Sequence, residues 1–538
     1  MGILHNLESI GVGIIGIITL LLLAWLFSNN KSNVPYRIIG WGLTLQFIFA
    51  LVILRDDVWG YIGLFILGAL IIVYNFSDSQ KSNENNDKSL LSIIAPIIIF
   101  SCIGFLIYFL DSLINIKALL LVLFVLKLFK NLIDQRVINS LIISAGVTFM
   151  VANEYSGLML FNVFSDGVKS FLDLSTYGAS FMFGSLTDGD RFGFLFAISA
   201  LPTIIFFGGF ISVLYYLGIM QKAIEGMGRF MRWSLGTSGA ESLSCSANVF
   251  VGQTEAPLLI KPYLKDMTKS ELFTIMTGGF ATIAGGVLAA YIMFGIHPGH
   301  LIAASLMSAP AAMLVSKIMY PETKETVTGA AEISMPNIKT GDNVIEAATN
   351  GITDGLRLAV NVGAMLIGFI ALVAVIDISL NFIDTYIDGK LFNGEWYSYT
   401  GKGLSPATGE YAGYFPGSLQ TFFGNILRPL AFLMGVPWKD SMHIANLLGI
   451  KLSLNEFVSY ATLGTYINNG ELDPKSIIIA SYALCGFANF SSIGIQIGGL
   501  SAIAPERKSD LAAIGLKAMF AGAIASWITA TVAGVLLS

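Results

Sequence analysis

Long apolar runs constrain this chain more than any other feature of its sequence. A stretch of about 20 apolar residues spans the hydrocarbon core of a bilayer as a helix. The runs cover residues 10–27, 36–54, 59–75, 91–110, 114–129, 137–152, 192–219, 271–295, 300–319, 355–380, 474–500 and 511–537. Only 12% of the residues are charged, against roughly 25% in soluble proteins. The sequence therefore predicts an all-α integral membrane protein with many spans.

Two further segments, residues 236–262 and 436–466, are apolar but interrupted by Gly, Pro or polar residues. Interrupted backbone is tolerated at membrane depth only where it lines a cavity inside the protein. We expect these segments to be re-entrant hairpins or broken helices, placed as counterparts in an inverted repeat.

The first interrupted segment holds a cluster of polar side chains. Its members are Asn248, Gln253, Thr254 and Glu255. A carboxylate at membrane depth costs a few kcal/mol, so it usually marks a functional site. If residues 248–255 are helical, Asn248, Val251 and Glu255 share one face. We interpret the cluster as a binding site for a polar solute; the alternative is a polar contact between helices.

Further polar groups lie in apolar surroundings near the C-terminus. Glu456 is one, and Asn489 and Ser492 share a helix face near Phe487, which can stack on a flat ring. Thr282 lies in the glycine-rich stretch 276–287, where unwound carbonyls can bind an alkali cation, although such stretches more often serve packing. Glu241 is equally compatible with structural hydrogen bonding and with support of a site.

Several functional classes are excluded by what the sequence contains. A net charge of −5 argues against a nucleic-acid partner. The three cysteines and the histidines have no metal-ligand spacing, and no phosphate-binding loop or nucleophile motif is present. We therefore expect neither an enzyme nor an ATP-driven pump.

The distribution of charge predicts the orientation in the membrane. Basic residues follow the first, third, fifth and seventh runs, whereas the intervening loops are acidic. By the positive-inside rule, residues 28–38 and 220–234 are cytoplasmic and both termini lie outside. Residues 220–234 are either an amphipathic helix at the cytoplasmic interface or a charged connector.

Several motifs together resemble the concentrative nucleoside transporter family. They lie at residues 236–244, 251–260, 276–285, 307–311, 454–457, 482–490 and 504–507. The resemblance covers about 160–538 and again 10–55. It implies a homotrimeric secondary transporter that imports nucleosides with a cation, usually sodium, by an elevator-like movement of a transport domain with two facing re-entrant hairpins.

The resemblance also implies roles for individual residues. The base side of the nucleoside would contact Gly252, Gln253, Thr254 and Glu255, with Val287 and Phe487 packed on the base. The ribose hydroxyls would bind Glu456, Asn489 and Ser492. Sodium would be coordinated by Asn248, Val251, Thr282 and Ile283.

The chain departs from the family between its second and third usual helices, where four extra apolar runs intervene. We expect N-terminal helices over 1–56, an accessory four-helix bundle over 57–155, a scaffold and interfacial helix over 156–235, and the transport core over 236–538. An even number of added spans keeps the orientation unchanged. The protein is expected to lie in the plasma membrane, in a bacterium, since Ile, Asn and Lys are abundant.

The sequence leaves several alternatives open. Sodium symport of nucleosides of the uridine, cytidine and adenosine class is the leading function, with no cofactor beyond the coupling ion. A desolvated glutamate would also suit proton coupling. An uncoupled facilitator, or a sensor that binds nucleosides without moving them, would use the same site.

Overall fold

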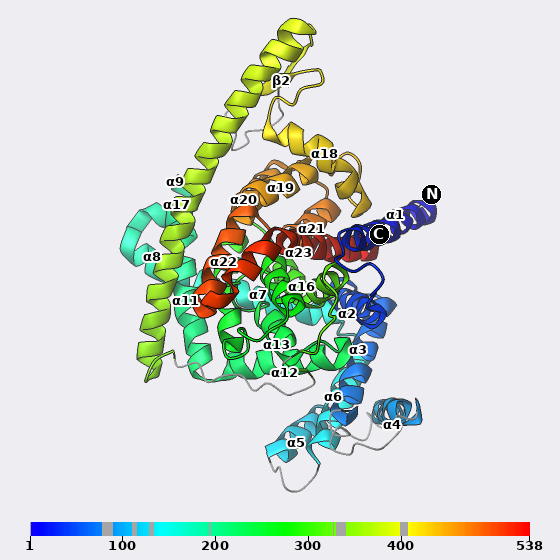
Figure 1. The fold of residues 1–538 in the computed structure, drawn as a ribbon. Coiled ribbons are helices and arrows are strands. Elements are labelled where there is room, and N and C mark those ends of the chain that lie inside the picture. The colour runs from blue at the N-terminus through cyan, green and yellow to red at the C-terminus, as the bar shows by residue number, and fades with distance from the viewer. Residues whose placement is uncertain are drawn as a thin grey trace. The chain divides into compact units, whose positions relative to one another are not determined.

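The computed structural model describes residues 2–77, 90–109, 116–128, 134–192, 195–326, 328–329, 340–398 and 407–537. It is almost entirely helical and divides into two compact units (Figure 1). Unit 1 comprises Met1–Leu43 and Ser165–Ser538, and unit 2 comprises Thr44–Phe164. Helices α2 (Tyr36–Leu54) and α7 (Gly157–Asp173) run across the unit boundaries.

Unit 2 is a small helical bundle. Its complete helices are α3 (Val58–Ser77), α4 (Leu90–Phe109), α5 (Ile116–Leu128) and α6 (Gln135–Ala152). Helix α6 packs against each of the other three. Asp134 caps its start, because the side chain accepts the amide hydrogen of Arg136. The extra apolar runs of the sequence therefore form helices around α6.

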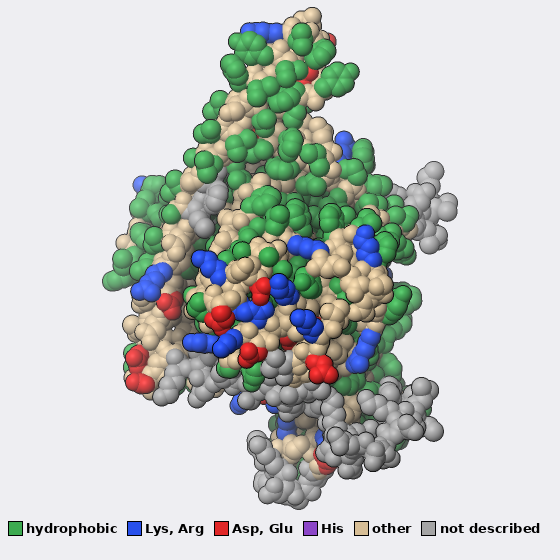
Figure 2. Space-filling model, viewed as in Figure 1, with side chains coloured by type: hydrophobic (Ala, Val, Ile, Leu, Met, Phe, Trp, Pro, Cys, Tyr) green, Lys and Arg blue, Asp and Glu red, His purple; other side chains and the backbone are tan. Residues whose placement is uncertain are grey.

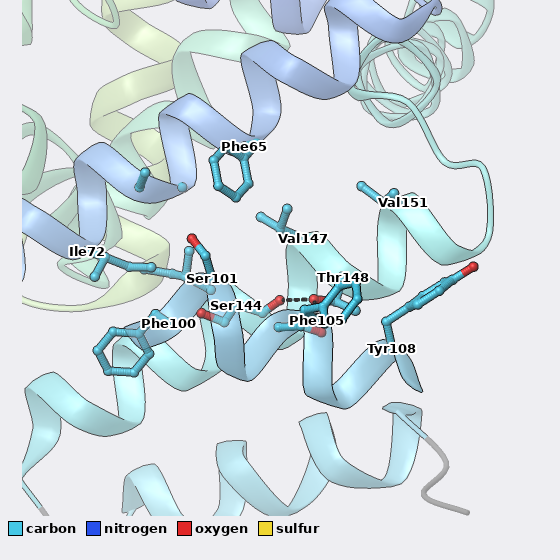
Figure 3. A pocket seen from close by; sticks show the side chains of 14 residues that line it. Phe65, Ile72, Phe100, Ser101, Phe105, Tyr108, Ser144, Val147, Thr148 and Val151 are labelled. Carbon is cyan, nitrogen blue, oxygen red and sulfur yellow. Dashed lines mark hydrogen bonds between the residues drawn. The ribbon is translucent and has the colours of Figure 1, made fainter. Parts of the chain in front are cut away.

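An apolar cavity of about 350 Å³ lies among α3, α4 and α6 (Figure 3). Phe65, Phe105 and Val147 line it, and its lining residues include no charged side chain. The hydroxyl of Thr148 donates to the carbonyl of Ser144 at 2.7 Å, so it is already satisfied within α6. This cavity offers little to a polar solute.

Unit 1 holds the other helices and one small sheet. Its elements are α1 (Gly2–Leu26), α8 (Ser175–Phe183), η2 (Gly184–Thr187), α9 (Gly189–Phe192), α10 (Phe196–Ser199), α11 (Leu201–Tyr216), α12 (Ile219–Leu235), α13 (Gly239–Ala247), η3 (Ala256–Ile260), α14 (Lys269–Ala281), α15 (Gly285–Met293), α16 (Pro298–Met319), α17 (Val344–Asp384), η4 (Thr385–Leu391), β1 (Trp396–Ser398), β2 (Gly409–Tyr411), α18 (Leu419–Leu433), α19 (Ser441–Ser453), α20 (Glu456–Asn469), α21 (Pro474–Ala483), α22 (Phe490–Ile503), η5 (Pro505–Arg507) and α23 (Lys508–Leu536). Strands β1 and β2 pair antiparallel.

The core of unit 1 is built around α23 and α16. Helix α23 packs against α1, α14, α16, α21 and α22, and its Ala- and Gly-rich second half is buried. Small residues let helix backbones approach closely in a membrane. The middle of α1 lies against the end of α23, because a Cβ on Gly13 would meet Val535, and the two helices run antiparallel, because a Cβ on Gly16 would meet Thr531. The two ends of the described chain therefore lie on one side of unit 1.

Helix α17 is the longest element, at 41 residues, and packs along α11 (Figure 1). The contact is close at small residues: a Cβ on Gly351 would come within 2.5 Å of the carbonyl oxygen of Gly208. Many side chains on the rest of α17 are exposed and apolar, such as Ile367 and Val375. In a bilayer these would face lipid.

Apolar side chains are dense over the upper part of the visible surface, whereas most of the charged side chains gather in a band across its lower middle (Figure 2). Among the described residues, eight helices are long and apolar enough to cross a membrane. Residues 220–234, for which a helix and a charged connector were both considered, lie in the helix α12.

The prediction of one apolar span over residues 474–500 was wrong in one respect. The structure divides this run into α21 and α22, with residues 484–489 outside both helices. Gly486 has a φ of +105°, which an L-residue with a side chain rarely adopts. The helix therefore stops before this glycine and starts again at Phe490.

Candidate functional site

Two interrupted helices meet inside unit 1. Helices α14 and α15 are separated by residues 282–284, called the first break, and α21 and α22 by residues 484–489, called the second break. A Cβ on Gly486 would lie 2.5 Å from the carbonyl oxygen of Phe280, so the second break packs directly on the end of α14. Non-helical backbone at membrane depth is stable only where it is buried or lines a cavity.

Two hairpins accompany the breaks. The first hairpin consists of α13, the turns over residues 248–255, and η3. The second consists of α19 and α20, joined by residues 454–455 alone. A capping box of Ser238 and Glu241 starts α13, and the side chain of Asn455 caps α20. These caps place Glu456 in the first turn of α20, at the hairpin tip.

Residues 248–255 are not helical, so the condition under which three of their side chains would share one helix face is not met. Helix α13 ends at Ala247, and the chain then forms turns as far as Glu255. The Glu255 carboxylate lies over Gly252, because an added Cβ would lie 2.2 Å from its oxygen Oε2 and would displace that side chain. Asn248, Val251 and Glu255 therefore do not share one face of a helix.

One cavity of about 200 Å³ lies where the hairpins and breaks converge. All nine residues that the sequence assigned to substrate binding line it: Gly252, Gln253, Thr254, Glu255, Val287, Glu456, Phe487, Asn489 and Ser492. They come from both hairpins, α15, the second break and α22. Segments more than 200 residues apart in the sequence thus form a single polar and aromatic site.

The wall at the second hairpin is a hydrogen-bonded polar group. The side-chain amide of Asn489 donates to Glu456 Oε2 at 2.9 Å, and the Tyr291 hydroxyl donates to Glu456 Oε1 at 3.3 Å. The side-chain oxygen Oδ1 of Asn489 accepts a hydrogen bond from the backbone N–H of Ser492 at 2.8 Å and so caps α22. The carboxylate is held in place with lone pairs left for a solute's hydroxyl groups.

The wall at the first hairpin is joined to α22. Gln253 Oε1 accepts from Gln496 Nε2 at 3.0 Å, and Gln496 also donates to the carbonyl of Met276 at 3.1 Å. Gln253 Nε2 donates to the hydroxyl of Ser492 at 3.4 Å. The Glu255 side chain, in contrast, is exposed to the cavity. It remains accessible as an acceptor for N–H or O–H donors of a solute.

Sequence reasoning missed several residues of the site. Asn361, Asn455 and Ser491 are polar residues that line the cavity, and Asn361 reaches it from α17. Tyr291 and Gln496 stand behind the lining and hydrogen-bond to Glu456 and Gln253. A signal existed for Asn361 and Gln496, since each is an uncharged amide inside a long apolar run. Tyr291 gave no such signal, because an aromatic residue in an apolar helix ordinarily belongs to the core.

The four residues assigned to sodium lie at the first break and in the turns of the first hairpin. These two elements touch, because the Gly285 amide donates to the carbonyl of Phe250 at 3.1 Å. Asn248 is 1% exposed, and neither polar atom of its side chain has a hydrogen-bond partner among the described residues. The Thr282 hydroxyl donates to the carbonyl of Gly278 at 2.9 Å and keeps its lone pairs. Amide, hydroxyl and carbonyl oxygens suit a hard cation such as sodium.

Glu241 lies outside the cavity. It forms a buried ion pair with Lys317 of α16 and caps α13 through the Ser238 amide. Lys317 also donates to the hydroxyl of Ser270 at 2.9 Å. Of the two roles considered for Glu241, the structure places it in the structural one.

Three family models match the chain in order. The N-terminus of Na⁺ dependent nucleoside transporters matches residues 15–78, nucleoside recognition matches 197–298, and the C-terminus of Na⁺ dependent nucleoside transporters matches 300–534. Residues 79–196, between the first two matches, contain most of unit 2.

Relatives and solved structures agree with these models. An uncharacterized transporter of Haemophilus influenzae is 42% identical, over 75% of this chain and 91% of its own length. Sodium/nucleoside cotransporter 2 of Mus musculus is 42% identical, over 72% of this chain and 56% of the mouse protein. The structure of CNTnw in an inward-facing substrate-bound state has a TM-score of 0.70 at 29% identity, covering 98% of this chain and 97% of that one. The chain belongs to the concentrative, Na⁺ dependent nucleoside transporter family.

Proposed function

We propose that this protein imports nucleosides by symport with sodium, and that the cavity between the two hairpin tips binds the nucleoside. The observation that carries this proposal is the convergence on one cavity of two glutamates, polar amides and an aromatic ring. A nucleoside has the matching chemistry, with a polar flat base and a ribose rich in hydroxyl groups. No phosphate is present to be repelled by the carboxylates.

The wall at the second hairpin binds the ribose, and the wall at the first hairpin binds the base. Glu456, Asn489 and Ser492 bind the ribose, because a carboxylate accepts from vicinal hydroxyls and an amide supplies the complementary donor. Gly252, Gln253, Thr254 and Glu255 face the base from the first hairpin, and Val287 and Phe487 pack on its ring. The substrates are then nucleosides of the uridine, cytidine and adenosine class.

Sodium binds beside this site rather than within it. Asn248, Thr282 and the backbone at Val251 and Ile283 supply the oxygen ligands. The turns that carry Asn248 continue directly into Gln253 and Glu255. A cation that orders these turns therefore also orders the base-binding wall, so each ligand lowers the cost of binding the other. This is thermodynamic coupling between two sites.

The remaining assignments are also proposals. The domains are the N-terminal helices over 1–56, the inserted bundle over 57–155, the scaffold and interfacial helices over 156–235, and the transport core over 236–538. We place the protein in a bacterial plasma membrane as a homotrimer with both termini outside. The antiparallel packing of α1 on α23 supports termini on one side.

Uptake by purified protein in liposomes tests the proposal. Radiolabelled uridine and adenosine are offered with an inward sodium gradient, a proton gradient, or neither. Accumulation above equilibrium with sodium alone is expected. Accumulation with protons alone would establish proton coupling instead, equilibration without any gradient would establish a facilitator, and binding without uptake would establish a sensor.

A further inference from the structure

Lys451 is a buried cation that has no role in the proposed nucleoside and sodium sites. It lies in the last turn of α19, the first arm of the second hairpin, and is 1% exposed. Among the described residues it has no carboxylate within the 4 Å of an ion pair. Burying an ammonium group is costly unless its charge is compensated. Its surroundings must therefore supply negative partial charge.

The compensation comes from the backbone of the second break. Lys451 Nζ donates to the carbonyl oxygen of Ala483 at 3.0 Å and to that of Cys485 at 2.9 Å. Ala483 is the last residue of α21, whose final carbonyls have no amide partner further along the helix. This end of a helix also carries the negative pole of its dipole. Lys451 thus binds an interrupted helix end through its carbonyl oxygens.

The first break also joins a helix end to a hairpin arm, but among the described residues no lysine donates to this helix end. Helix α14 ends at Ala281, beside the first hairpin, whose first arm α13 ends one residue before Asn248. The Asn248 side chain is buried there with no hydrogen-bond partner among the described residues. Each hairpin arm thus meets an interrupted helix end. A neutral amide stands at one and an ammonium at the other.

We propose that the ammonium of Lys451 is a tethered cation, which does at the second break what the transported sodium does at the first. This inference rests on the proposed function, because it takes the first break as the sodium site. Lys451 then holds the terminal carbonyl of α21 at Ala483 and, together with the Ser526 hydroxyl, the carbonyl of Cys485, which leaves one site for a mobile ion. Lys451 also holds in place the second break, whose Phe487 and Asn489 line the nucleoside cavity.

The test separates the charge of Lys451 from its hydrogen bonds. Lys451→Gln keeps N–H donors but removes the charge, Lys451→Arg keeps the charge, and Lys439→Gln is the control, since Lys439 is exposed and pairs with Asp473. Binding of uridine and the sodium dependence of uptake are measured for each, together with thermal stability in detergent. Lys451→Gln should weaken uridine affinity about tenfold or more, Lys451→Arg should weaken it less, and the control should match wild type.

A second variant tests whether a cation as such is required. Lys451→Ala removes the tether and leaves space for a small amine. Propylammonium should restore uridine uptake to this variant, whereas propanol of similar size should not. In the absence of amine, the sodium Hill coefficient of Lys451→Ala should rise above the value of about one expected for a single mobile cation, because sodium can enter the second break.

The outcomes distinguish this inference from the proposed function. If the wild-type protein takes up uridine without any dependence on sodium, the proposed function fails first. If the wild type depends on sodium but Lys451→Gln binds uridine with unchanged affinity, Lys451 does not act through its charge. Equal rescue by propanol and propylammonium, or a loss of thermal stability alone, would reduce Lys451 to a packing residue.

Discussion

Replacing Glu456 with Gln tests the proposed binding of the ribose at the second hairpin. The carboxylate is 3% exposed and accepts hydrogen bonds from Asn489 and Tyr291. Gln has nearly the same shape, but one carboxylate oxygen becomes an N–H₂ donor. That donor cannot accept from a ribose hydroxyl and faces the donor groups already present. The substitution therefore removes charge and acceptor capacity while it preserves packing.

The expected magnitude follows from the number of bonds that lose their charge. A hydrogen bond to a charged group contributes about 1.5–3 kcal/mol and a neutral one about 0.5–1.5 kcal/mol. Two vicinal ribose hydroxyls that both lose a charged acceptor should therefore cost about 2–3 kcal/mol of binding free energy, which is about 30- to 150-fold in affinity. The free energy of unfolding should change little, because the variant no longer has to bury a negative charge.

Equilibrium binding of uridine and of 2′,3′-dideoxyuridine to the purified protein measures this loss. Wild type should prefer uridine strongly, and the Glu456→Gln variant should lose most of that preference. Glu395→Gln is the matched control, because this glutamate is exposed and lies outside the cavity. If Glu456→Gln binds uridine as wild type does, with unchanged protein yield, the ribose assignment is refuted.

Three further predictions address the neighbouring groups. Asn248→Ala removes a proposed cation ligand and should raise the sodium concentration for half-maximal uptake about tenfold; an unchanged sodium dependence would remove Asn248 from the cation site. Gly252→Ala places a Cβ against the Glu255 carboxylate and should reduce uptake about tenfold or more with little change in melting temperature; full uptake would contradict the turn geometry. Lys317→Met leaves Glu241 as an unpaired buried charge and should cost about 3–5 kcal/mol of stability. Adding Glu241→Gln to Lys317→Met should recover part of the lost stability, measured by thermal unfolding, and no recovery would argue against the ion pair.

Much of the site was predictable because polar residues at membrane depth are conspicuous. Glu255, Glu456 and Asn489 each stand out in apolar sequence, and the structure brings all three to one cavity. Asn489 also carries a local signal, since Asn is among the residues preferred at a helix N-cap. That signal marks the start of α22 within the run 474–500, although hydropathy alone favours an unbroken span.

What could not be predicted depends on contacts between distant segments. The length of the helix before Asn248 depends on where the first hairpin must turn to meet the first break, which no local pattern encodes. Tyr291 belongs to the site only because α15 and α20 lie side by side. The role of Lys451 is likewise set by the carbonyls of Ala483 and Cys485, more than thirty residues away.

Reciprocal coupling between sodium and the nucleoside is the direct consequence of two sites that share the first hairpin. Uridine affinity of the detergent-purified protein is measured with saturating sodium and with none, and sodium affinity with saturating uridine and with none. Linkage requires the two ratios to be equal, and we expect both to exceed about tenfold in wild type and to approach one in Asn248→Ala. A wild-type uridine affinity that is the same with and without sodium would show that the ion does not order the nucleoside site.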